Sequence, residues 1–280
     1  FTMCRASFIY AFEQYKAWLF NPRILLIIYT VVFLNDSLTV KMLEICEETG
    51  YTLNLAEPLA LILSKSVNAV IIPIVFLALS TDFPRNSDNL FSIYRMSRKG
   101  LVIGEIIFSV MSALTYVILL FLGTFLYCAG SCSAGNEWSE YTAVLFSEYP
   151  EIYRRNTSLF LTSATYMQGT PYEVIFHSTA LMFLYTLFLS LVIMLFKQLR
   201  KKEFGVVIGI MLTLCGLATD SGASPIMWVF PITHTVYGWH FDIFMREQHF
   251  SLFGSYIYFA VLILAMLVTN LALSKKVNLP

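Results

Sequence analysis

The apolar residues of this chain gather in long blocks separated by polar connections. Hydrophobic residues make up 58% of the 280 residues and charged residues 13%, whereas soluble domains carry roughly 45–50% apolar and about 25% charged residues. A soluble fold has too little polar surface to cover such blocks, so we expect a lipid bilayer as the solvent. The formal net charge is zero, which gives no electrostatic reason to expect nucleic-acid binding.

Six segments approach the roughly 20 mostly apolar residues that a spanning helix needs. They are residues 24–43, 59–80, 101–128, 174–196, 204–219 and 253–273. The fifth is short, and the first two contain polar residues, among them Asn35, Asp36 and Lys65. The pattern predicts an all-α polytopic membrane protein with six transmembrane helices in a single transmembrane domain over residues 1–280.

Three further segments fit neither a span nor a plain loop. Residues 1–22 alternate apolar and charged side chains in a pattern suited to an amphipathic helix on a membrane surface. Residues 220–252 contain a short apolar stretch bracketed by Pro225 and Pro231, which predicts a re-entrant or extracellular hairpin before the last span. Residues 129–171 carry too many apolar residues for a disordered loop, so we expect an extracellular segment that is partly helical.

The basic residues predict the orientation. If the N-terminus, the loops 81–100 and 197–203 and the C-terminus share one side, that side collects 13 of the 18 Lys and Arg residues. These are Arg5, Lys16, Arg23, Arg85, Arg95, Arg98, Lys99, Lys197, Arg200, Lys201, Lys202, Lys275 and Lys276. Basic loops stay in the cytoplasm. We therefore expect both termini to be cytoplasmic, which an even number of spans satisfies.

The connection over residues 81–100 is unusual for a loop because it carries apolar residues at helical spacing. Ser87 or Asp88 is suited to cap a short helix, and the apolar positions follow at Leu90, Phe91, Ile93, Tyr94 and Met96. A plain loop needs no such residues. We expect this helix to press its apolar side into another protein.

A resemblance to a known family begins at this connection. A polar cytoplasmic segment, then Arg-x-Ser-Arg-x-Gly, then a span that opens with Gly-Glu resembles the permeases of type-2 ATP-binding cassette (ABC) transporters. The residues that carry it are Arg95, Ser97, Arg98, Gly100, Gly104 and Glu105. The predicted layout agrees with that family along almost the whole chain. It has an N-terminal amphipathic helix, six spans, cytoplasmic termini and a broken hairpin before the last span. The long segment 129–171 and the polar Asn35-Asp36 pair depart from the family pattern.

The resemblance implies a function and partners. It implies an exporter permease in the bacterial plasma membrane, paired with a second permease copy or homologue and driven by a separate nucleotide-binding subunit. It makes residues 81–100 the coupling segment, with Leu90, Phe91, Tyr94, Arg95 and Arg98 as its contacts to that subunit. No G-x-x-x-x-G-K-[ST] loop occurs in the chain, so ATP and magnesium are expected on the partner and no cofactor on this chain.

Charged residues inside the predicted spans are candidate path residues or internal ion pairs. Asp36, Lys65 and Glu105 are the three candidates, because burying a charge in a membrane is costly unless it faces protein or water. Glu105 lies one turn into the third span, within expected reach of Arg98 or Lys99. Asp36 and Lys65 both lie toward the outer side, where pairing with each other is one alternative and a place on a substrate path the other.

Two rival functions belong to other classes. A membrane-embedded enzyme would use His234, His240 and Asp242 or the intramembrane acids, and a receptor or immunity protein would sequester a ligand with its external segments. The histidine spacing matches no zinc motif and no G-x-S-x-G occurs, so we assign no metal or catalytic residue and expect ordinary interfacial histidines. Cys128 and Cys132 are either free thiols or a disulfide on an oxidising side.

Overall fold

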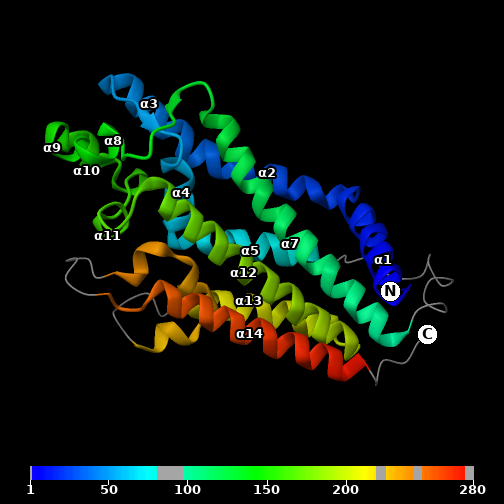
Figure 1. Ribbon diagram of the computed structural model, residues 1–280. Coiled ribbons are helices and arrows are strands. Elements are labelled where there is room, and N and C mark those ends of the chain that lie inside the picture. Colours follow the sequence, from blue (N-terminus) through cyan, green and yellow to red (C-terminus); the bar gives the residue numbers. More distant parts are fainter. Residues whose placement is uncertain (1, 81–96, 219–224, 242–247, 275–280) are drawn as a thin grey trace.

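The computed structural model describes residues 2–80, 97–218, 225–241 and 248–274, which are mostly helical (Figure 1). Among these residues, four helices are long and apolar enough to cross a membrane, or five if one bent pair counts as a span. The four are Pro22–Thr49, Arg98–Cys128, Pro171–Gln198 and Leu252–Leu273. The prediction of an α-helical membrane protein is confirmed, and the count of six spans stays a prediction.

The N-terminal part contains two helical stretches. Helix α1 (Thr2–Leu19) precedes a turn at Asn21, whose side chain accepts the Arg23 N–H at 2.9 Å and starts the short helix η1 (Pro22–Ile24). The helix then continues through α2 (Leu25–Leu34), the π-helical turn η2 (Asn35–Thr39) and α3 (Val40–Thr49). It ends at Gly50, whose φ of 77° favours glycine. The stretch runs from Pro22 to Thr49 and so extends beyond the predicted 24–43 at both ends, and Asn35 and Thr39 are hydrogen-bonded within it.

The second predicted span is broken. Helix α4 (Glu57–Ser64) and helix α5 (Ser66–Ser80) meet at an angle of 83°. The break falls at Lys65, whose backbone is extended and whose ammonium donates to the Phe160 carbonyl at 3.2 Å. Pro73 lies inside α5 and is not the cause. Segment 59–80 is therefore two helices that meet at Lys65, where the side chain contacts the distant residue Phe160.

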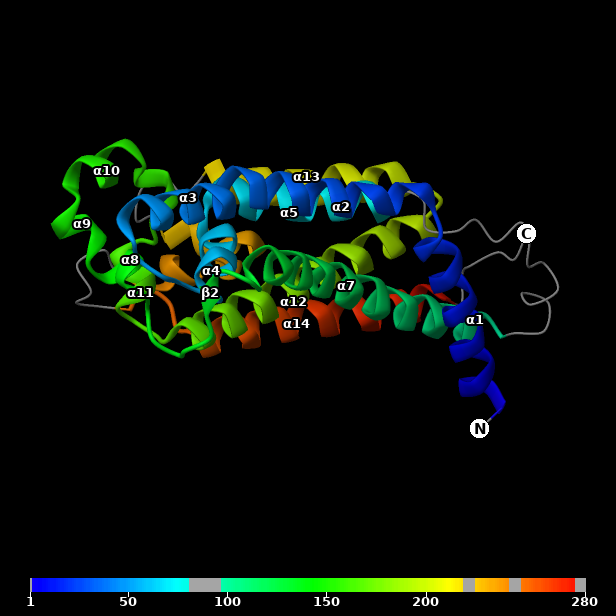
Figure 2. The ribbon, with the colours of Figure 1, turned by 90° about the horizontal axis from the view of Figure 1, so that it is seen from above.

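The long helices form two layers (Figure 2). One layer contains α2, α5 and α13 (Lys202–Ala218), with α5 in the middle. The other contains α7 (Arg98–Cys128), α12 (Pro171–Gln198) and α14 (Leu252–Leu273). Helix α12 lies at the centre, with 67% of its most apolar window buried, whereas α14 has only 11% buried and lies at the outside. Helix α13 has 17 residues and covers most of the short fifth predicted span.

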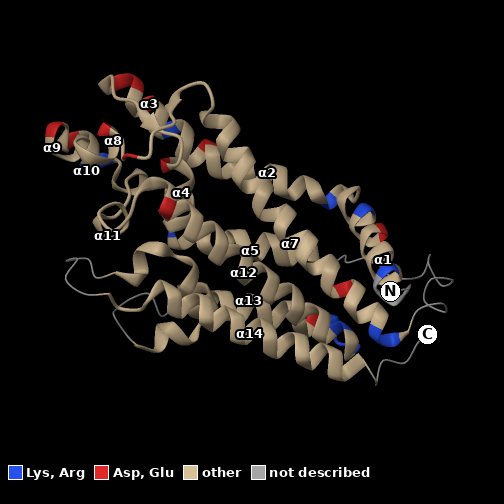
Figure 3. Cartoon of the chain, in the orientation of Figure 1, with Lys and Arg blue, Asp and Glu red and all other residues tan. Residues whose placement is uncertain are grey.

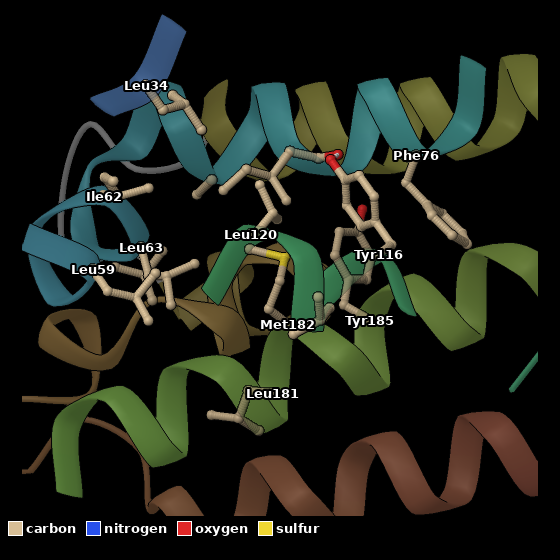
Figure 4. Packing of buried hydrophobic residues seen from close by; sticks show 14 of the residues in the cluster. Leu34, Leu59, Ile62, Leu63, Phe76, Tyr116, Leu120, Leu181, Met182 and Tyr185 are labelled. Carbon is tan, nitrogen blue, oxygen red and sulfur yellow. Dashed lines mark hydrogen bonds between the residues drawn. The ribbon is translucent and has the colours of Figure 1, made fainter. Parts of the chain in front are cut away.

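Buried tyrosine side chains make hydrogen bonds between helices inside an apolar core (Figure 4). The Tyr116 hydroxyl of α7 donates to the Ile72 carbonyl of α5 at 2.7 Å, and the Tyr116 ring packs against Phe76. The hydroxyls of Tyr185 on α12 and Thr213 on α13 lie 2.7 Å apart. Each tyrosine fills a wholly buried position and still has a partner for its hydroxyl, as burial in an apolar medium requires.

Helix α1 packs across the start of α7. The Ser7 hydroxyl donates to the Gly100 carbonyl at 2.8 Å, and the hydroxyls of Tyr15 and Thr115 lie 2.7 Å apart. A Cβ atom at Gly104 would lie 2.6 Å from the Tyr10 ring, so this close approach requires glycine. One face of α1 is thus buried in protein, and Phe8, Ile9 and Phe12 are exposed.

The segment between α7 and α12 is helical in part, as predicted. A two-residue parallel pairing joins strand β1 (Leu53–Asn54) to strand β2 (Cys132–Ser133). Short helices follow: α8 (Glu140–Ala143), α9 (Leu145–Glu148), α10 (Pro150–Arg155), η4 (Thr157–Leu159) and α11 (Ser163–Tyr166). Tyr141, Leu145, Leu159, Phe160 and Leu161 are buried, with Tyr141 stacked on Phe160, whereas Phe146, Tyr149 and Met167 are exposed.

The segment before α14 is a series of 3₁₀ turns. These are η5 (Pro225–Val229), η6 (Pro231–Thr235) and η7 (Tyr237–His240). Helix η6 packs on α13, where a Cβ atom at Gly216 would lie 2.0 Å from Ile232 Cγ2. The predicted hairpin is therefore made of 3₁₀ turns, as far as the described residues show, and it is held against the bundle.

Candidate functional site

Charge is distributed unequally between the two ends of the bundle (Figure 3). Basic residues gather where α1 lies, where α7 begins and where α12 turns into α13. Acidic residues gather at the opposite end, around α3 and the short helices α8 to α10. The two ends of the bundle therefore differ in the sign of the charge that predominates.

A glutamate and a lysine join two helices near the basic end. Lys197 Nζ of α12 lies 2.7 Å from Glu105 Oε1 of α7, and the two side chains are only 28% and 17% exposed. The expectation that Glu105 pairs with Arg98 or Lys99 is wrong. Arg98 and Lys99 lie seven and six positions earlier on the same helix, about 9–10 Å along its axis, whereas α12 brings Lys197 directly alongside.

A small cavity adjoins this ion pair. Its volume is about 20 Å³, which is room for one water molecule. It is lined by the ion pair and by Tyr10, Gln14, Phe108, Ser109 and Met194. Helices α1, α7 and α12 therefore meet at one polar point near the basic end.

The Asn35-Asp36 pair lies on a π-helical turn midway along Pro22–Thr49, a kind of turn that is frequent at functional sites. Asn35 is buried, donates to the Val31 carbonyl at 2.8 Å and to Thr124 Oγ1 of α7 at 3.3 Å, and accepts from Thr39. Asp36 is exposed. Asn35 therefore has a structural role, and Asp36 presents a carboxylate at the surface of the bundle.

Asp36 and Lys65 are not brought together. Lys65 Nζ instead donates to the carbonyl of Phe160, because the break after α4 aims the side chain at the segment between α7 and α12. The predicted Asp36–Lys65 pairing is therefore wrong. Lys65 anchors this segment, and Asp36 is the remaining candidate for a path residue.

Asp36 continues an exposed face of the α2–α5–α13 layer. Tyr29, Phe33 and Asp36 follow one another at helical spacing, and all three are exposed. Helix α13 exposes Phe204, Val207, Met211 and Leu214. A carboxylate at the centre of a bilayer costs about 2.5–3.5 kcal/mol on insertion scales, so a charged residue there usually faces protein or water. The face around Asp36 is therefore a candidate for contact with water or another chain.

The predicted coupling contacts are mostly outside the described residues. Leu90, Phe91, Tyr94 and Arg95 fall within 81–96, and their role stays a prediction. Arg98 is the first residue of α7, just after Ser97, whose hydroxyl accepts the Gly100 N–H at 3.1 Å and caps the helix. Helix α7 therefore leads directly from the predicted coupling segment into the bundle.

Two histidines converge on one serine, which the sequence analysis missed. Ser255 Oγ lies 2.8 Å from His234 Nδ1 and 2.8 Å from His240 Nε2, and all three side chains are completely buried. The expectation of interfacial histidines is wrong for these two. No group of three or more His, Cys, Asp or Glu side chains among the described residues is placed to hold a metal ion.

Aromatic side chains cover the histidine–serine cluster. Trp228, Phe250 and Tyr258 surround the His234 ring, with centroid distances of 5.3, 5.0 and 4.1 Å. Asp242, the third member of the enzyme hypothesis, lies outside the described residues. A serine hydroxyl next to an imidazole is an arrangement that nucleophilic catalysis uses. Because all three side chains are completely buried, we favour a role other than catalysis.

A buried carboxylate that the sequence analysis also missed fixes the segment between α7 and α12. Glu57, at the start of α4, accepts the Ser139 N–H and the Ser139 hydroxyl, both at 2.6 Å. The Asn54 amide donates to the carbonyls of Gly135 and Glu137. Glu57 follows β1 closely in sequence but Ser139 is 82 residues away, so only the fold reveals the contact.

Near this carboxylate, Cys128 and Cys132 are both free thiols, so no disulfide joins them in this structure. Cys128 is buried and Cys132 is half-buried. A hydrogen bond from the Cys128 thiol lowers the pKa of Cys132.

An open cleft of about 480 Å³ lies at the acidic end, where α12 begins. It is lined by residues 136–138 and 166–171 and by Glu173. Trp138 Nε1 donates to the Gly169 carbonyl at 2.8 Å and closes one wall. The volume falls in the range of small-molecule sites.

Comparison of the chain with models of protein families, with curated proteins and with solved structures found no match.

Proposed function

We propose that this chain is the permease subunit of a type-2 ABC exporter and that two copies work with two ATPase subunits. The observation that carries the proposal is the layer of α2, α5 and α13. These helices lie in the first, second and fifth predicted spans, which the family resemblance places around the translocation path. Their shared face carries Asp36, a charged residue that favours water over lipid.

The proposal includes six spans with both termini in the cytoplasm of a bacterial cell. The unequal distribution of charge supports this orientation, because the basic end contains α1, the start of α7 and the turn from α12 to α13. Single-cysteine labelling in a cysteine-free chain tests it. Positions 98 and 201 should react from the cytoplasmic side and position 140 from outside. Labelling of positions 140 and 201 from the same side would contradict the six-span topology.

Energy would enter this chain through segment 81–100. ATP and magnesium bind the partner, and closure of the ATPase subunits would shift the coupling segment and with it the start of α7. Helix α7 is linked to α1 through Ser7 and Gly100 and to α12 through Glu105 and Lys197. A shift of α7 would therefore be shared by α1 and α12, and the two-layer bundle would alternate between inward-open and outward-open states. The family resemblance implies drugs, antimicrobial peptides or lipid-linked glycans as cargo.

Cross-linking between copies tests the proposed path. Single cysteines at Tyr29 of α2 and Met211 of α13 lie on the exposed face of the layer, 69% and 58% exposed. Cysteine at Val261 of α14, 60% exposed, is the matched control in the other layer. We expect dimeric cross-links in membranes from positions 29 and 211 but not from 261. Cross-links from 261 alone would contradict the proposed arrangement.

The cleft before α12 favours a second candidate, a protein that sequesters a ligand outside the cell. Its volume and its aromatic wall at Trp138 suit a small molecule or a peptide side chain. Such a protein would protect cells in the absence of any ATPase, and Trp138→Ala would abolish protection. Loss of protection when the ATPase subunit is removed would exclude this alternative.

A further inference from the structure

The cluster of His234, His240 and Ser255 has five hydrogen-bond contacts that determine where its protons are. His234 Nε2 faces the Trp228 carbonyl at 2.9 Å, and His234 Nδ1 faces Ser255 Oγ at 2.8 Å. His240 Nε2 faces the same Ser255 oxygen at 2.8 Å. His240 Nδ1 faces the carbonyls of Val236 and Tyr237 at 3.1 and 3.2 Å. Every nitrogen of the two rings is therefore in contact with an oxygen.

The neutral cluster has one proton fewer than its hydrogen-bond contacts require. A carbonyl only accepts, so the nitrogens facing Trp228 and Val236 each need a proton. The two remaining nitrogens face one hydroxyl, which has a single proton to donate, so one of them must donate in turn. Three N–H groups are required, and two neutral imidazoles supply two.

The missing proton is at His240 Nδ1. When one contact lacks a proton, two lone pairs face each other, and this repulsion is smallest where the atoms are farthest apart. The carbonyl contacts of His240 Nδ1 are the longest in the cluster. In the neutral state, His234 Nε2–H therefore donates to Trp228, Ser255 donates to His234 Nδ1, and His240 Nε2–H donates to Ser255.

We propose that this cluster is a buried binding site for a single proton, which binds at His240 Nδ1 and is absent at neutral pH. Binding turns the one repulsive contact into a hydrogen bond and leaves every nitrogen and the hydroxyl satisfied. The proposal rests on the geometry of the cluster and does not depend on the proposed transport function.

The surroundings explain why the site is empty at neutral pH. Burial lowers the pKa of His240 to about 4 and also lowers the pKa of His234. The titratable groups near the two rings among the described residues are Tyr258 of α14, which stacks on His234, and His177 of α12, near His240. The Tyr237 ring stacks on His177, and only the Tyr237 carbonyl faces His240. None of them carries a negative charge at neutral pH to balance an imidazolium.

The site joins two turns to a long helix. His234 belongs to η6, His240 to η7 and Ser255 to α14, and η6 also packs on α13. A complete set of hydrogen bonds makes a buried polar network more rigid than a partly satisfied one. Proton uptake at His240 Nδ1 therefore adds a hydrogen bond within the η7 turn, to the carbonyl of Val236 or Tyr237, and places a positive charge in a buried site.

The chain has four histidines, so ¹⁵N NMR of the histidine rings can report the protonation of each ring nitrogen and test the proposal directly. The full-length chain, labelled with ¹⁵N-histidine and held in lipid nanodiscs, is titrated from pH 8 to pH 4. At pH 8 we expect both His234 and His240 to be Nε2–H tautomers with unprotonated Nδ1 atoms. As the pH falls, His240 Nδ1 should gain a proton when the cluster takes up its first proton. His177, whose Nδ1 meets the single hydroxyl of Tyr256 at 2.9 Å, is the internal reference.

The Ser255→Ala variant tests the origin of the missing proton. Without the hydroxyl, His240 Nε2 no longer has to donate, so the neutral ring should switch to the Nδ1–H tautomer and donate to Val236. A neutral His240 that carries its proton on Nδ1 in the unmodified chain would overturn the proposal. Uptake of a proton by the cluster that leaves His240 Nδ1 unprotonated would overturn it too. The titration of the unmodified chain decides the matter even if Ser255→Ala does not fold.

Discussion

Lys197 Nζ of α12 lies 2.7 Å from Glu105 Oε1 of α7, and this ion pair is the charged contact that joins the two helices near the basic end. Both side chains are mostly buried, so removing one leaves the other charge poorly solvated. We expect Glu105→Ala to lower the free energy of unfolding by about 1–3 kcal/mol. The midpoint of thermal unfolding in lipid nanodiscs measures the effect.

The Glu13–Lys16 pair of α1 is the matched control, because its side chains are 53% and 49% exposed. Glu13→Ala should cost less than about 0.5 kcal/mol, since water and salt screen exposed pairs. The exchanged pair Glu105→Lys with Lys197→Glu should recover part of the loss. Equal effects of the two single substitutions would show that the buried pair is no stronger than a surface pair.

Glu57 and Ser139 attach the segment between α7 and α12 to the bundle. In Glu57→Ala the Ser139 N–H and hydroxyl lose their acceptor, and the expected cost is about 2 kcal/mol or more. Limited proteolysis should leave residues 129–171 mostly intact in the unmodified chain and cut them faster in this variant. Glu140→Ala, one residue beyond Ser139 and exposed, should be cut at the normal rate. Rapid cutting of the unmodified chain would contradict the packed structure.

Acid should destabilise the chain through His240. Its folded-state pKa of about 4 lies below the ordinary value of about 6.5, so between these values the unfolded chain binds the proton more tightly than the folded chain. The stability contribution is complete above pH 6.5 and is lost as the pH falls to about 4, by about 3 kcal/mol in all. Thermal unfolding from pH 7.5 to pH 4 measures it.

His240→Gln is the control for the pH dependence, because its amide can still donate to Ser255 and does not titrate. The difference in unfolding midpoint between this variant and the unmodified chain should change across pH 6.5 to 4. A difference that stays constant over that range would contradict the prediction.

The sequence predicted the long helices well where an uninterrupted apolar block marks the helix. Segment 101–128 became α7 with an earlier start at Arg98, because an uninterrupted apolar block forms a spanning helix whatever its neighbours. The break at Lys65 was not predicted, and the contact that accompanies it is made with a carbonyl 95 residues away at Phe160. Local patterns carry no information about such a contact.

The same reason limited the prediction of the sites. Glu105 was identified as a buried charge, but its partner Lys197 is 92 residues away, and the nearer Arg98 was the natural expectation from sequence. His234 and His240 were noticed as a pair, whereas Ser255 sits in the first turn of an ordinary-looking span. A polar residue facing inward from an apolar helix is a signal that could have pointed to Ser255.

The coupling segment gives the prediction closest to the mechanism. Phe91 and Tyr94 are three residues apart and would share one face of a short helix. Phe91→Ala combined with Tyr94→Ala should weaken association with the ATPase subunit by about 2 kcal/mol or more, or uncouple ATP hydrolysis from transport, while insertion in the membrane stays normal. Asn89→Ala should have little effect.

If those aromatic side chains instead bury against the chain's own helices, the double variant would lose stability and expression. Thermal unfolding and membrane yield separate this outcome from a loss of partner binding. A stable double variant with complete association and full transport would refute the coupling role.

The composition of the native complex tests the central claim most directly. The full-length chain is purified from its own cell membrane in mild detergent, and the mass of the intact complex is measured by native mass spectrometry together with ATP hydrolysis. The account predicts two copies of this chain, or one copy with a homologous permease, bound to two ATP-hydrolysing subunits. A chain that purifies without any ATPase subunit, and is active alone, would contradict it.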